Sequence, residues 1–311
     1  MGNSILSTLN KTRKMKRGSS SKSSKSSKSK ENNNTCQNEQ KQLQYYLPNH
    51  VKDTDIMVIL HFLARYLFQS IFSAPIEHNF SQEDYKVLDV GCGPGTWLLE
   101  LATVHKFPKF FGLDLFPIYP SEIKPDNVEF IQGDILKGLP FSDNTFDYVH
   151  QGNMLSVFTF EEWHSAIQEL IRVCKPGGYI EFTEPELATN TGPILTRFYD
   201  ALITLSDSRN VKIRISKEII KILESSPTVK NVDYKIATVS LGTKKGGNAG
   251  QAYMEVHDGY FLNDPMPETM CKFMDLSQEE YLKLFKDAKN EVETGVAPDC
   301  DLYRIWCQKA Q

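Results

Sequence analysis

A short run between a strand and a helix constrains the fold more than any other feature of this sequence. Residues 86–90, which read as a short strand, lead directly into Gly91, Gly93 and Gly95, and residues 96–105 then read as a helix. Glycine is needed where a backbone turns tightly and approaches a ligand closely, and the free N–H groups at a helix start bind a negatively charged group. The run therefore predicts a ligand-binding strand–turn–helix unit, with an ordinary strand-to-helix turn as the alternative.

After this turn, short apolar runs alternate with helix-length segments. We expect strands over 86–90, 110–115, 128–132, 146–150 and 179–183, and helices over 96–105 and 161–175. Such alternation is typical of a parallel sheet with helices on its faces. No internal repeat is evident.

The flanking regions carry weaker patterns. Apolar residues spaced by three and four after Asp53 predict a helix that ends before Pro75. Beyond Pro185 we expect helices over 193–206, 216–225 and 276–292, and strands over 232–241 and 302–308. The pattern over 252–261 is ambiguous, and the glycine- and lysine-rich stretch 242–250 is interpreted as a flexible connection.

Charge divides the chain into two parts. The 311 residues have a net charge of −4, yet residues 1–30 contain nine basic residues and no acidic one. The remaining 281 residues carry 26 basic against 39 acidic side chains, a net charge of −13. An acidic body disfavours a protein that reads nucleic acid through a basic surface.

The basic segment, residues 1–43, is rich in Ser, Lys and Asn, and we expect it to be disordered because it has little apolar surface to bury. Three interpretations remain open: a solubilising tail, a contact with an import factor or other anionic partner through 11–17, and a membrane-surface anchor.

No apolar run is long enough to span a membrane, and no signal-peptide pattern is present. The six cysteines form no C-x-x-C pair and no zinc set. We therefore expect a reduced cytoplasmic and/or nuclear protein without a metal.

A carboxylate follows the glycine turn at the end of the next predicted strand. Asp114 ends the second predicted strand, nineteen residues after Gly95. An acid at this position accepts hydrogen bonds from the ribose hydroxyls in nucleotide-binding βαβ units. Asp114 is thus a candidate ribose ligand, although the glycine spacing differs from the dinucleotide fingerprint. An NAD-dependent dehydrogenase remains an alternative that rests on the glycine turn alone.

At this point the sequence resembles a class I S-adenosylmethionine-dependent methyltransferase. Four segments resemble that family's motifs in the expected order: 89–95, 112–115, 132–147 and 172–180. The resemblance implies S-adenosylmethionine as cofactor and assigns its binding to nine residues. The first motif, around the methionine end, contributes Asp89, Gly91, Cys92, Gly93 and Gly95; the ribose segment contributes Asp114 and Leu115; and the adenine pocket contributes Asp134 and Ile135. Gln151 is a tenth candidate from its position after the fourth strand, where it could orient the cofactor carboxylate or a polar acceptor.

A narrower resemblance reaches from about residue 45 to 205. Residues 46–49, 117–120 and 179–184 are similar to the fungal trans-aconitate and LaeA-like methyltransferases. The departures are residues 151–153 and 243–251. The resemblance implies an α/β fold, Rossmann-like and doubly wound, with a mostly parallel seven-stranded sheet whose last strands are 232–241 and 302–308.

We divide the chain accordingly. Residues 1–43 form the tail, 44–85 an N-terminal helical lid, 86–186 the cofactor-binding core, and 187–311 a C-terminal half that completes the sheet and caps the substrate.

The acceptor is less constrained by the sequence. His150 ends the fourth strand, where open α/β sheets bind ligands, and is the candidate general base, with a structural histidine as the alternative. Motifs for the amino-methylation of DNA bases and for cytosine C5 methylation are absent. We expect methyl transfer to a small metabolite or carboxylic acid in preference to a protein. A LaeA-like regulator that binds the cofactor without catalysis is the alternative.

Overall fold

The computed structural model describes residues 54–311. The predicted tail, 1–43, and the first part of the predicted lid lie outside the described residues. Within residues 54–311, seven strands form one sheet in the order β3-β2-β1-β4-β5-β7-β6. The strands are β1 (Lys86–Val90), β2 (Lys109–Asp114), β3 (Val128–Gln132), β4 (Phe146–Gly152), β5 (Cys174–Pro185), β6 (Val229–Ser240) and β7 (Asp299–Lys309).

The strand directions follow the expected pattern. The first five strands pair in parallel, and β7 is antiparallel to both β5 and β6. The chain order changes direction between β1 and β4, where ligands bind in open α/β sheets. The Rossmann-like, mostly parallel seven-stranded sheet is therefore confirmed.

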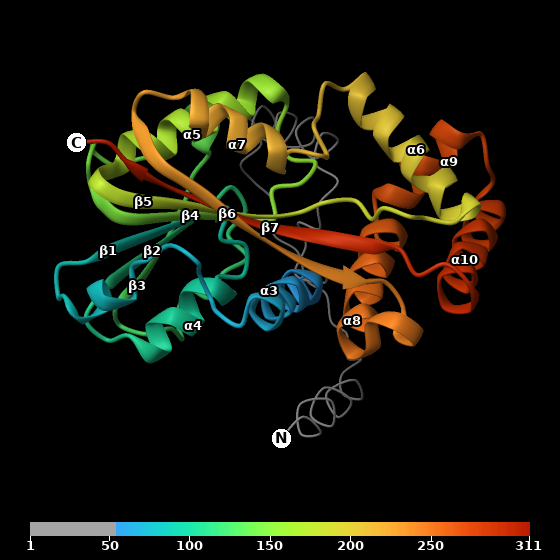
Figure 1. Ribbon diagram of the computed structural model, residues 1–311, viewed down its shortest axis with the longest axis horizontal. Helices are drawn as coiled ribbons and strands as arrows, with labels where there is room; N and C mark the ends of the chain where they lie inside the picture. The colour runs from blue at the N-terminus through green and yellow to red at the C-terminus, as the bar shows by residue number, and fades with distance from the viewer. Residues whose placement is uncertain (1–53) are drawn as a thin grey trace, which may run out of the picture. The chain divides into compact units, whose positions relative to one another are not determined.

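Helices cover both faces of the sheet, α4 (Thr96–Val104) on one face and α5 (Phe160–Val173) and α7 (Ser216–Ser225) on the other (Figure 1). A capping box begins α5: the Thr159 hydroxyl accepts from the Glu162 N–H at 3.2 Å, and the Glu162 carboxylate accepts from the Thr159 N–H at 2.9 Å. The apolar stripe of α5, including the fully buried Trp163, packs on the sheet.

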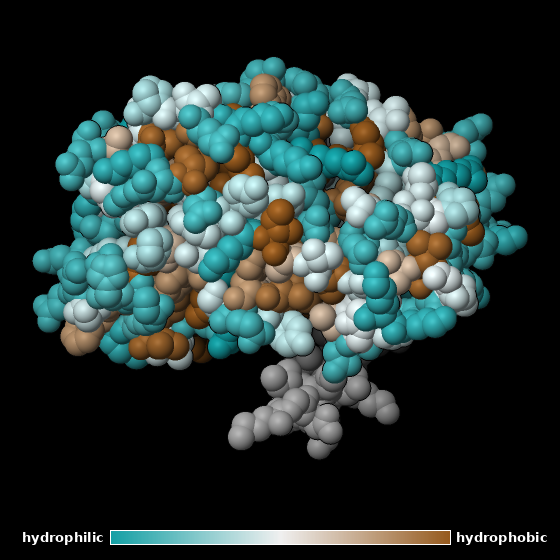
Figure 2. Space-filling view, viewed as in Figure 1, coloured by the Kyte–Doolittle hydropathy of each residue, from teal (hydrophilic) through white to brown (hydrophobic). Residues whose placement is uncertain are grey.

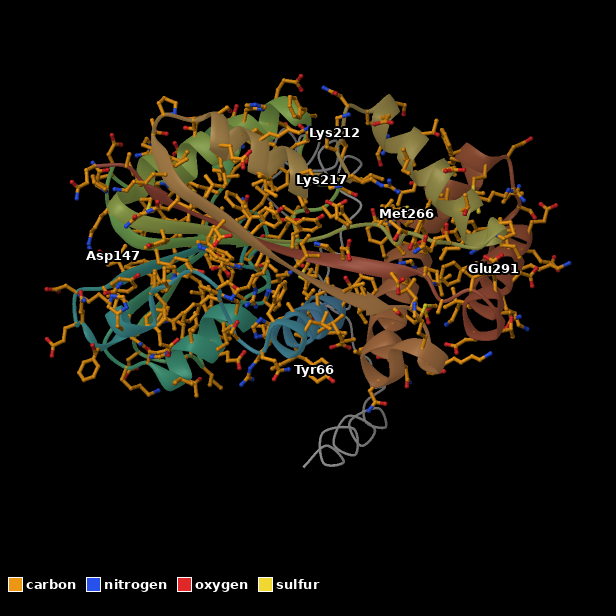
Figure 3. All side chains as sticks on the ribbon, in the orientation of Figure 1. Tyr66, Asp147, Lys212, Lys217, Met266 and Glu291 are labelled. Atoms are coloured by element: carbon orange, nitrogen blue, oxygen red, sulfur yellow. The ribbon has the colours of Figure 1, made fainter. Side chains whose placement is uncertain are left out.

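A second apolar core joins five helices. They are α3 (Thr54–Phe68), α6 (Pro193–Ser208), α8 (Thr243–Leu262), α9 (Met266–Met274) and α10 (Gln278–Thr294). Glu291 of α10 accepts hydrogen bonds from the Ile194 and Leu195 N–H groups at the start of α6, at 3.1 and 3.0 Å (Figure 3). This carboxylate supplies the cap that Gly192, which has no side chain, does not.

The stretch 242–250 differs from its interpretation as a flexible connection. Residues from Thr243 onward belong to α8, with a kink at Gly247. A Cβ added at Gly246 would lie 1.9 Å from the Ser240 carbonyl oxygen, and one at Gly250 would lie 2.3 Å from that of Gly242. The glycines therefore allow the helix to pack directly on the backbone at the end of β6. In the sequence alone, the same glycines resemble a flexible connection.

Hydrophilic residues predominate on the face shown in Figure 2, with apolar residues scattered among them. Within residues 54–311 no helix is long and apolar enough to cross a membrane.

Candidate functional site

The glycine turn lies between β1 and α4, as predicted. Gly91, Gly93 and Gly95 have φ of 73°, 53° and 76°, in the left-handed region that favours glycine. A Cβ at Gly95 would lie 2.5 Å from the Phe130 ring, and one at Gly91 would lie 2.8 Å from Met154 Sδ. The left-handed φ thus favours glycine at each of the three positions. At Gly91 and Gly95 the neighbouring side chains also leave no room for a Cβ.

Asp114, at the end of β2, fastens this turn from the neighbouring strand. Its Oδ2 accepts a hydrogen bond from the Gly93 N–H at 2.8 Å, and its Oδ1 accepts from the Phe116 N–H at 2.8 Å. Burial raises the pKa of Asp114, while these two N–H groups act in the opposite direction. The carboxylate is therefore held in a fixed orientation beside the turn.

The next predicted residues follow the ends of β2 and β3. Leu115, Asp134 and Ile135 line the same cavity as Asp114 and the glycine turn. The Asp134 Oδ1 accepts from the Leu136 N–H at 3.1 Å, which caps the short helix η4 (Ile135–Lys137).

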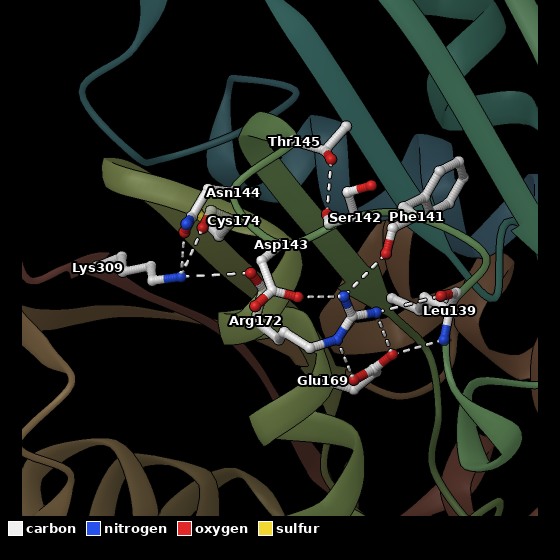
Figure 4. Close-up of polar contacts among 10 residues, drawn as sticks. All are labelled: Leu139, Phe141, Ser142, Asp143, Asn144, Thr145, Glu169, Arg172, Cys174 and Lys309. Carbon is white, nitrogen blue, oxygen red and sulfur yellow. Dashed lines mark hydrogen bonds and ion pairs between the residues drawn. The ribbon is translucent and has the colours of Figure 1, made fainter.

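One arginine anchors the loop that follows η4 (Figure 4). Arg172 of α5 donates to the carbonyls of Leu139 and Phe141, at 3.1 and 2.8 Å, and pairs with Glu169 and Asp143. The Glu169 carboxylate also accepts from the Leu139 N–H at 2.6 Å. This network ties the chain after Asp134 to α5 and so holds that edge of the cavity.

His150, the candidate base, lies in the cavity wall with both ring nitrogens engaged. Nδ1 is 2.8 Å from Asp89 Oδ1, and Nε2 is 3.3 Å from the Thr183 hydroxyl. The ring stacks on Trp97 with centroids 4.2 Å apart and planes 6° from parallel. This arrangement favours the structural alternative, in which His150 joins β1, β4, β5 and α4. Its predicted role as a base stays a prediction.

The structure does not bring every predicted residue to the cavity. Asp89, Gly91, Cys92 and Gly93 line it, whereas Gly95 and Gln151 do not. Side chains alternate across a strand, so Gln151 lies on the same face as Val149, in the core under α5. The Gln151 amide is fully buried there and has no hydrogen-bond partner in the described residues.

The cavity extends past the glycine turn to a wall that sequence reasoning missed. Tyr253, His257 and Tyr260 of α8 line it, together with Glu186 from the loop after β5. The spacing of four and three places the α8 residues on one helix face. A clear helical pattern over 252–261 would have predicted this wall of the cavity, but the pattern in that segment is ambiguous.

The helix α3 closes the cavity on another side. Its residues Ile56, Met57 and His61 line the cavity, and Met57 Sδ lies 3.0 Å from where a Cβ of Gly93 would be. His61 Nε2 lies 2.5 Å from Glu100 Oε2 on α4, and Arg65 also pairs with Glu100. The lid predicted from the sequence is thus joined to the helix that follows the glycine turn.

A buried ion pair supports the segment after α3. Arg304 of β7 donates to the hydroxyl and the carbonyl of Ser70, both at 2.9 Å, and lies near Glu181. Glu181 in turn accepts from the N–H groups of Ser73 and Ala74.

Among the residues described, no group of three or more His, Cys, Asp or Glu is placed to hold a metal ion.

Comparison with known proteins agrees with this geometry. Residues 87–178 match the family model described as Methyltransferase domain. The chain is 33% identical over 162 residues to the N-methyltransferase verN of Clonostachys rogersoniana, covering 50% of this chain and 55% of that protein. It is 27% identical over 252 residues to the N-methyltransferase gliN of Aspergillus fumigatus, covering 76% and 87%.

A third relative belongs to a different functional class. The chain is 31% identical over 149 residues to the secondary metabolism regulator laeA of Aspergillus niger, covering 45% of this chain and 36% of the regulator. The match to laeA therefore spans about a third of that protein's length, whereas the match to gliN spans most of its relative.

Proposed function

We propose that this class I S-adenosylmethionine-dependent methyltransferase, which is similar to the LaeA-like group, transfers a methyl group to a small uncharged metabolite. The observation that carries the proposal is a single cavity that runs from the glycine turn and Asp114 to the aromatic wall of α8. One end has the groups that a nucleoside needs, and the other end has room for an acceptor beside it.

The residues at the first end fit S-adenosylmethionine. We expect the glycine turn and the start of α4 to hold the methionine part, Asp114 to accept from the ribose hydroxyls, and Asp134 and Ile135 to border the adenine; all of these segments line the cavity. When bound, this cofactor supplies a methyl group made electrophilic by its positively charged sulfur. The contribution of the chain is to hold and surround the reactants.

Positioning and exclusion of water are therefore the catalytic work of this site. Aligning two reactants at near-attack distance lowers the barrier by up to ~7–11 kcal/mol in the best intramolecular cases. Helices α3 and α8 and the loop after β4, including Met154, enclose the cavity with largely apolar side chains. No catalytic triad is required for such a transfer.

The charges around the cavity favour an uncharged acceptor. Of the described residues that line it, Arg304 is the sole Arg or Lys, and it is engaged with Ser70 and Glu181. Glu186 lies at the acceptor end. A carboxylate acceptor would be buried near this acid without a free cation, which is costly. Of the two acceptors expected from the sequence, we therefore propose the small metabolite and not the small carboxylic acid. The names of verN and gliN favour nitrogen as the methylated atom.

The test uses the full chain, radiolabelled S-adenosylmethionine and a fungal cell extract divided into small molecules, protein and nucleic acid. We expect label in the small-molecule fraction, lost in Asp114→Ala and retained in the exposed control Asp84→Ala. Label in protein or nucleic acid alone would contradict the proposal.

A second candidate function has a specific observation behind it, the similarity to laeA. In that case the chain binds the cofactor and regulates without transferring a methyl group. Calorimetric binding of S-adenosylhomocysteine, with no labelled product in any fraction, would favour this regulator.

We also propose that the chain acts in the cytoplasm and/or the nucleus, where residues 11–17 contact an import factor or another anionic surface. Fluorescent fusions with and without residues 1–43 test this. A membrane-bound fusion would favour the surface anchor instead.

A further inference from the structure

The acceptor end of the cavity contains one polar ring that the proposed function leaves without a role. His257 of α8 lines the cavity and is 8% exposed. Three aromatic rings surround it, those of Tyr199, Tyr253 and Phe261, with centroids 5.7, 5.9 and 5.5 Å away. An imidazole in such apolar surroundings is costly unless both of its nitrogens find partners.

One nitrogen has a partner and the other does not. His257 Nε2 lies 2.8 Å from the Tyr199 hydroxyl on α6. Nδ1 makes no hydrogen bond to any residue in the described part of the chain. The free nitrogen belongs to a side chain that lines the cavity, so it is available to a molecule held there.

The Tyr199 hydroxyl decides which nitrogen carries the proton. Burial raises the pKa of Tyr199 well above its usual value, so the hydroxyl keeps its proton, while the Ala188 backbone N–H opposes this shift as a donor to the same oxygen. The buried hydroxyl proton needs an acceptor, and Nε2 is the one within reach. An Nε2 that accepts carries no proton, so a neutral ring has its proton on Nδ1.

The ring is neutral over the physiological range. Burial lowers the pKa of His257 to about 4. The ionisable groups near this end of the cavity include Tyr199 on α6, Tyr253 and Tyr260 on α8, Glu186 after β5, Arg214 before α7, and Cys300 on β7. His257 is consequently a hydrogen-bond donor toward the cavity, and its free nitrogen is not a base.

The position of His257 relates it to the reacting end of the cavity. Tyr260, three residues further on the same helix face, has its hydroxyl 3.0 Å from that of Ser156. Ser156 belongs to the loop after β4, in which Met154 lies against Gly91. Helix α8 therefore packs over the loop that borders the glycine turn.

We propose that the Nδ1–H of His257 donates a hydrogen bond to an uncharged carbonyl oxygen of the methyl acceptor, and that Tyr199 fixes this donor by holding Nε2. The inference rests on the proposed function, because it assigns the acceptor that shares the cavity. A carbonyl oxygen fits because it needs a donor and brings no proton of its own into apolar surroundings. A carboxylate would lie near Glu186 without a free cation. His257 is thus a specificity-determining residue.

The experiment compares three probes on the full chain saturated with S-adenosylhomocysteine. Acetophenone has the carbonyl, α-methylstyrene replaces its oxygen by a CH₂ group, and benzoate replaces the ketone by a carboxylate. We expect acetophenone to bind roughly tenfold more tightly than either of the others, as a hydrogen bond in a dry pocket provides.

The variants isolate the donor. The double variant Tyr199→Phe/His257→Phe removes both partners of the internal hydrogen bond, which costs less stability than removing one. We expect it to lose the preference for acetophenone and to keep its affinity for S-adenosylhomocysteine. Tyr281→Phe is the matched control, because it removes a buried, hydrogen-bonded hydroxyl from a residue that does not line the cavity, and should keep the preference.

A spectroscopic readout separates this role from simple packing. In ¹⁵N spectra of histidine-labelled protein, His257 should be a neutral Nδ1–H ring at pH 7 whose Nδ1 signal shifts when acetophenone is added. An Nε2–H ring, or an equal affinity for the ketone and the alkene in the unaltered protein, would overturn the inference. Failure to bind S-adenosylhomocysteine would instead overturn the proposed function itself.

Discussion

Glu184 provides a prediction whose size follows directly from its surroundings. This β5 residue is fully buried, and its two oxygens accept hydrogen bonds from the Met154 N–H at 3.1 and 3.0 Å. Burial raises the pKa of Glu184 to about 8 from a usual value of 4.5, against the opposing effect of the Met154 N–H. Between these two values the folded protein holds a proton that the unfolded chain has released.

The sign of the effect on stability follows from this difference in bound protons. The contribution of Glu184 is complete below the unfolded pKa and is lost as the pH rises through the folded pKa. One proton gives a slope of about −1.4 kcal/mol in the free energy of unfolding per pH unit. In Glu184→Gln, which keeps the size and one acceptor oxygen, this slope is absent.

The assay is urea unfolding followed by tryptophan fluorescence at pH 5.5 and 7.5. Relative to Glu184→Gln, the unaltered protein should lose about 3 kcal/mol of unfolding free energy between these two values. The exposed Glu83→Gln controls for the loss of one negative charge. A difference between the unaltered protein and Glu184→Gln that stays constant with pH would refute the reasoning.

Three further predictions follow from the site. Gly95→Ala places a Cβ against the Phe130 ring at a φ of 76°, so we expect a loss of about 1–3 kcal/mol in chemical unfolding; an unchanged midpoint would contradict this. Arg304→Met leaves Glu181 buried without its cation, so calorimetric melting should show a loss of about 3–5 kcal/mol in the free energy of unfolding. An unchanged free energy of unfolding would contradict this. Removal of residues 1–43 should leave the affinity for S-adenosylhomocysteine unchanged in calorimetry, and a loss of binding would move the boundary between tail and enzyme.

The sheet could be predicted because its signals are local. The run into Gly91 and the alternation that follows it predicted the five parallel strands, and the pattern over 276–292 predicted α10. Helix α9 and the first half of α8 were missed. At Gly246 and Gly250 the backbone packs against residues that precede the helix, and that contact has no local pattern in the sequence.

The cofactor end of the site was more predictable than the acceptor end. The resemblance placed Asp114 and Asp134 at strand ends, and both line the cavity. Gln151 was assigned from its place after His150, but strand alternation turns it to the opposite face. His257 gains its role from Tyr199, 58 residues away in the chain. Contacts of this kind exist only in the folded protein.

Calorimetric titration of the full chain with S-adenosylhomocysteine, with NAD as the comparison ligand, tests the central claim most directly. We predict that S-adenosylhomocysteine binds at one site, that Asp114→Asn weakens this binding at least roughly tenfold through the lost charge-assisted hydrogen bonds, and that NAD does not bind. Binding of NAD without binding of S-adenosylhomocysteine would contradict the account.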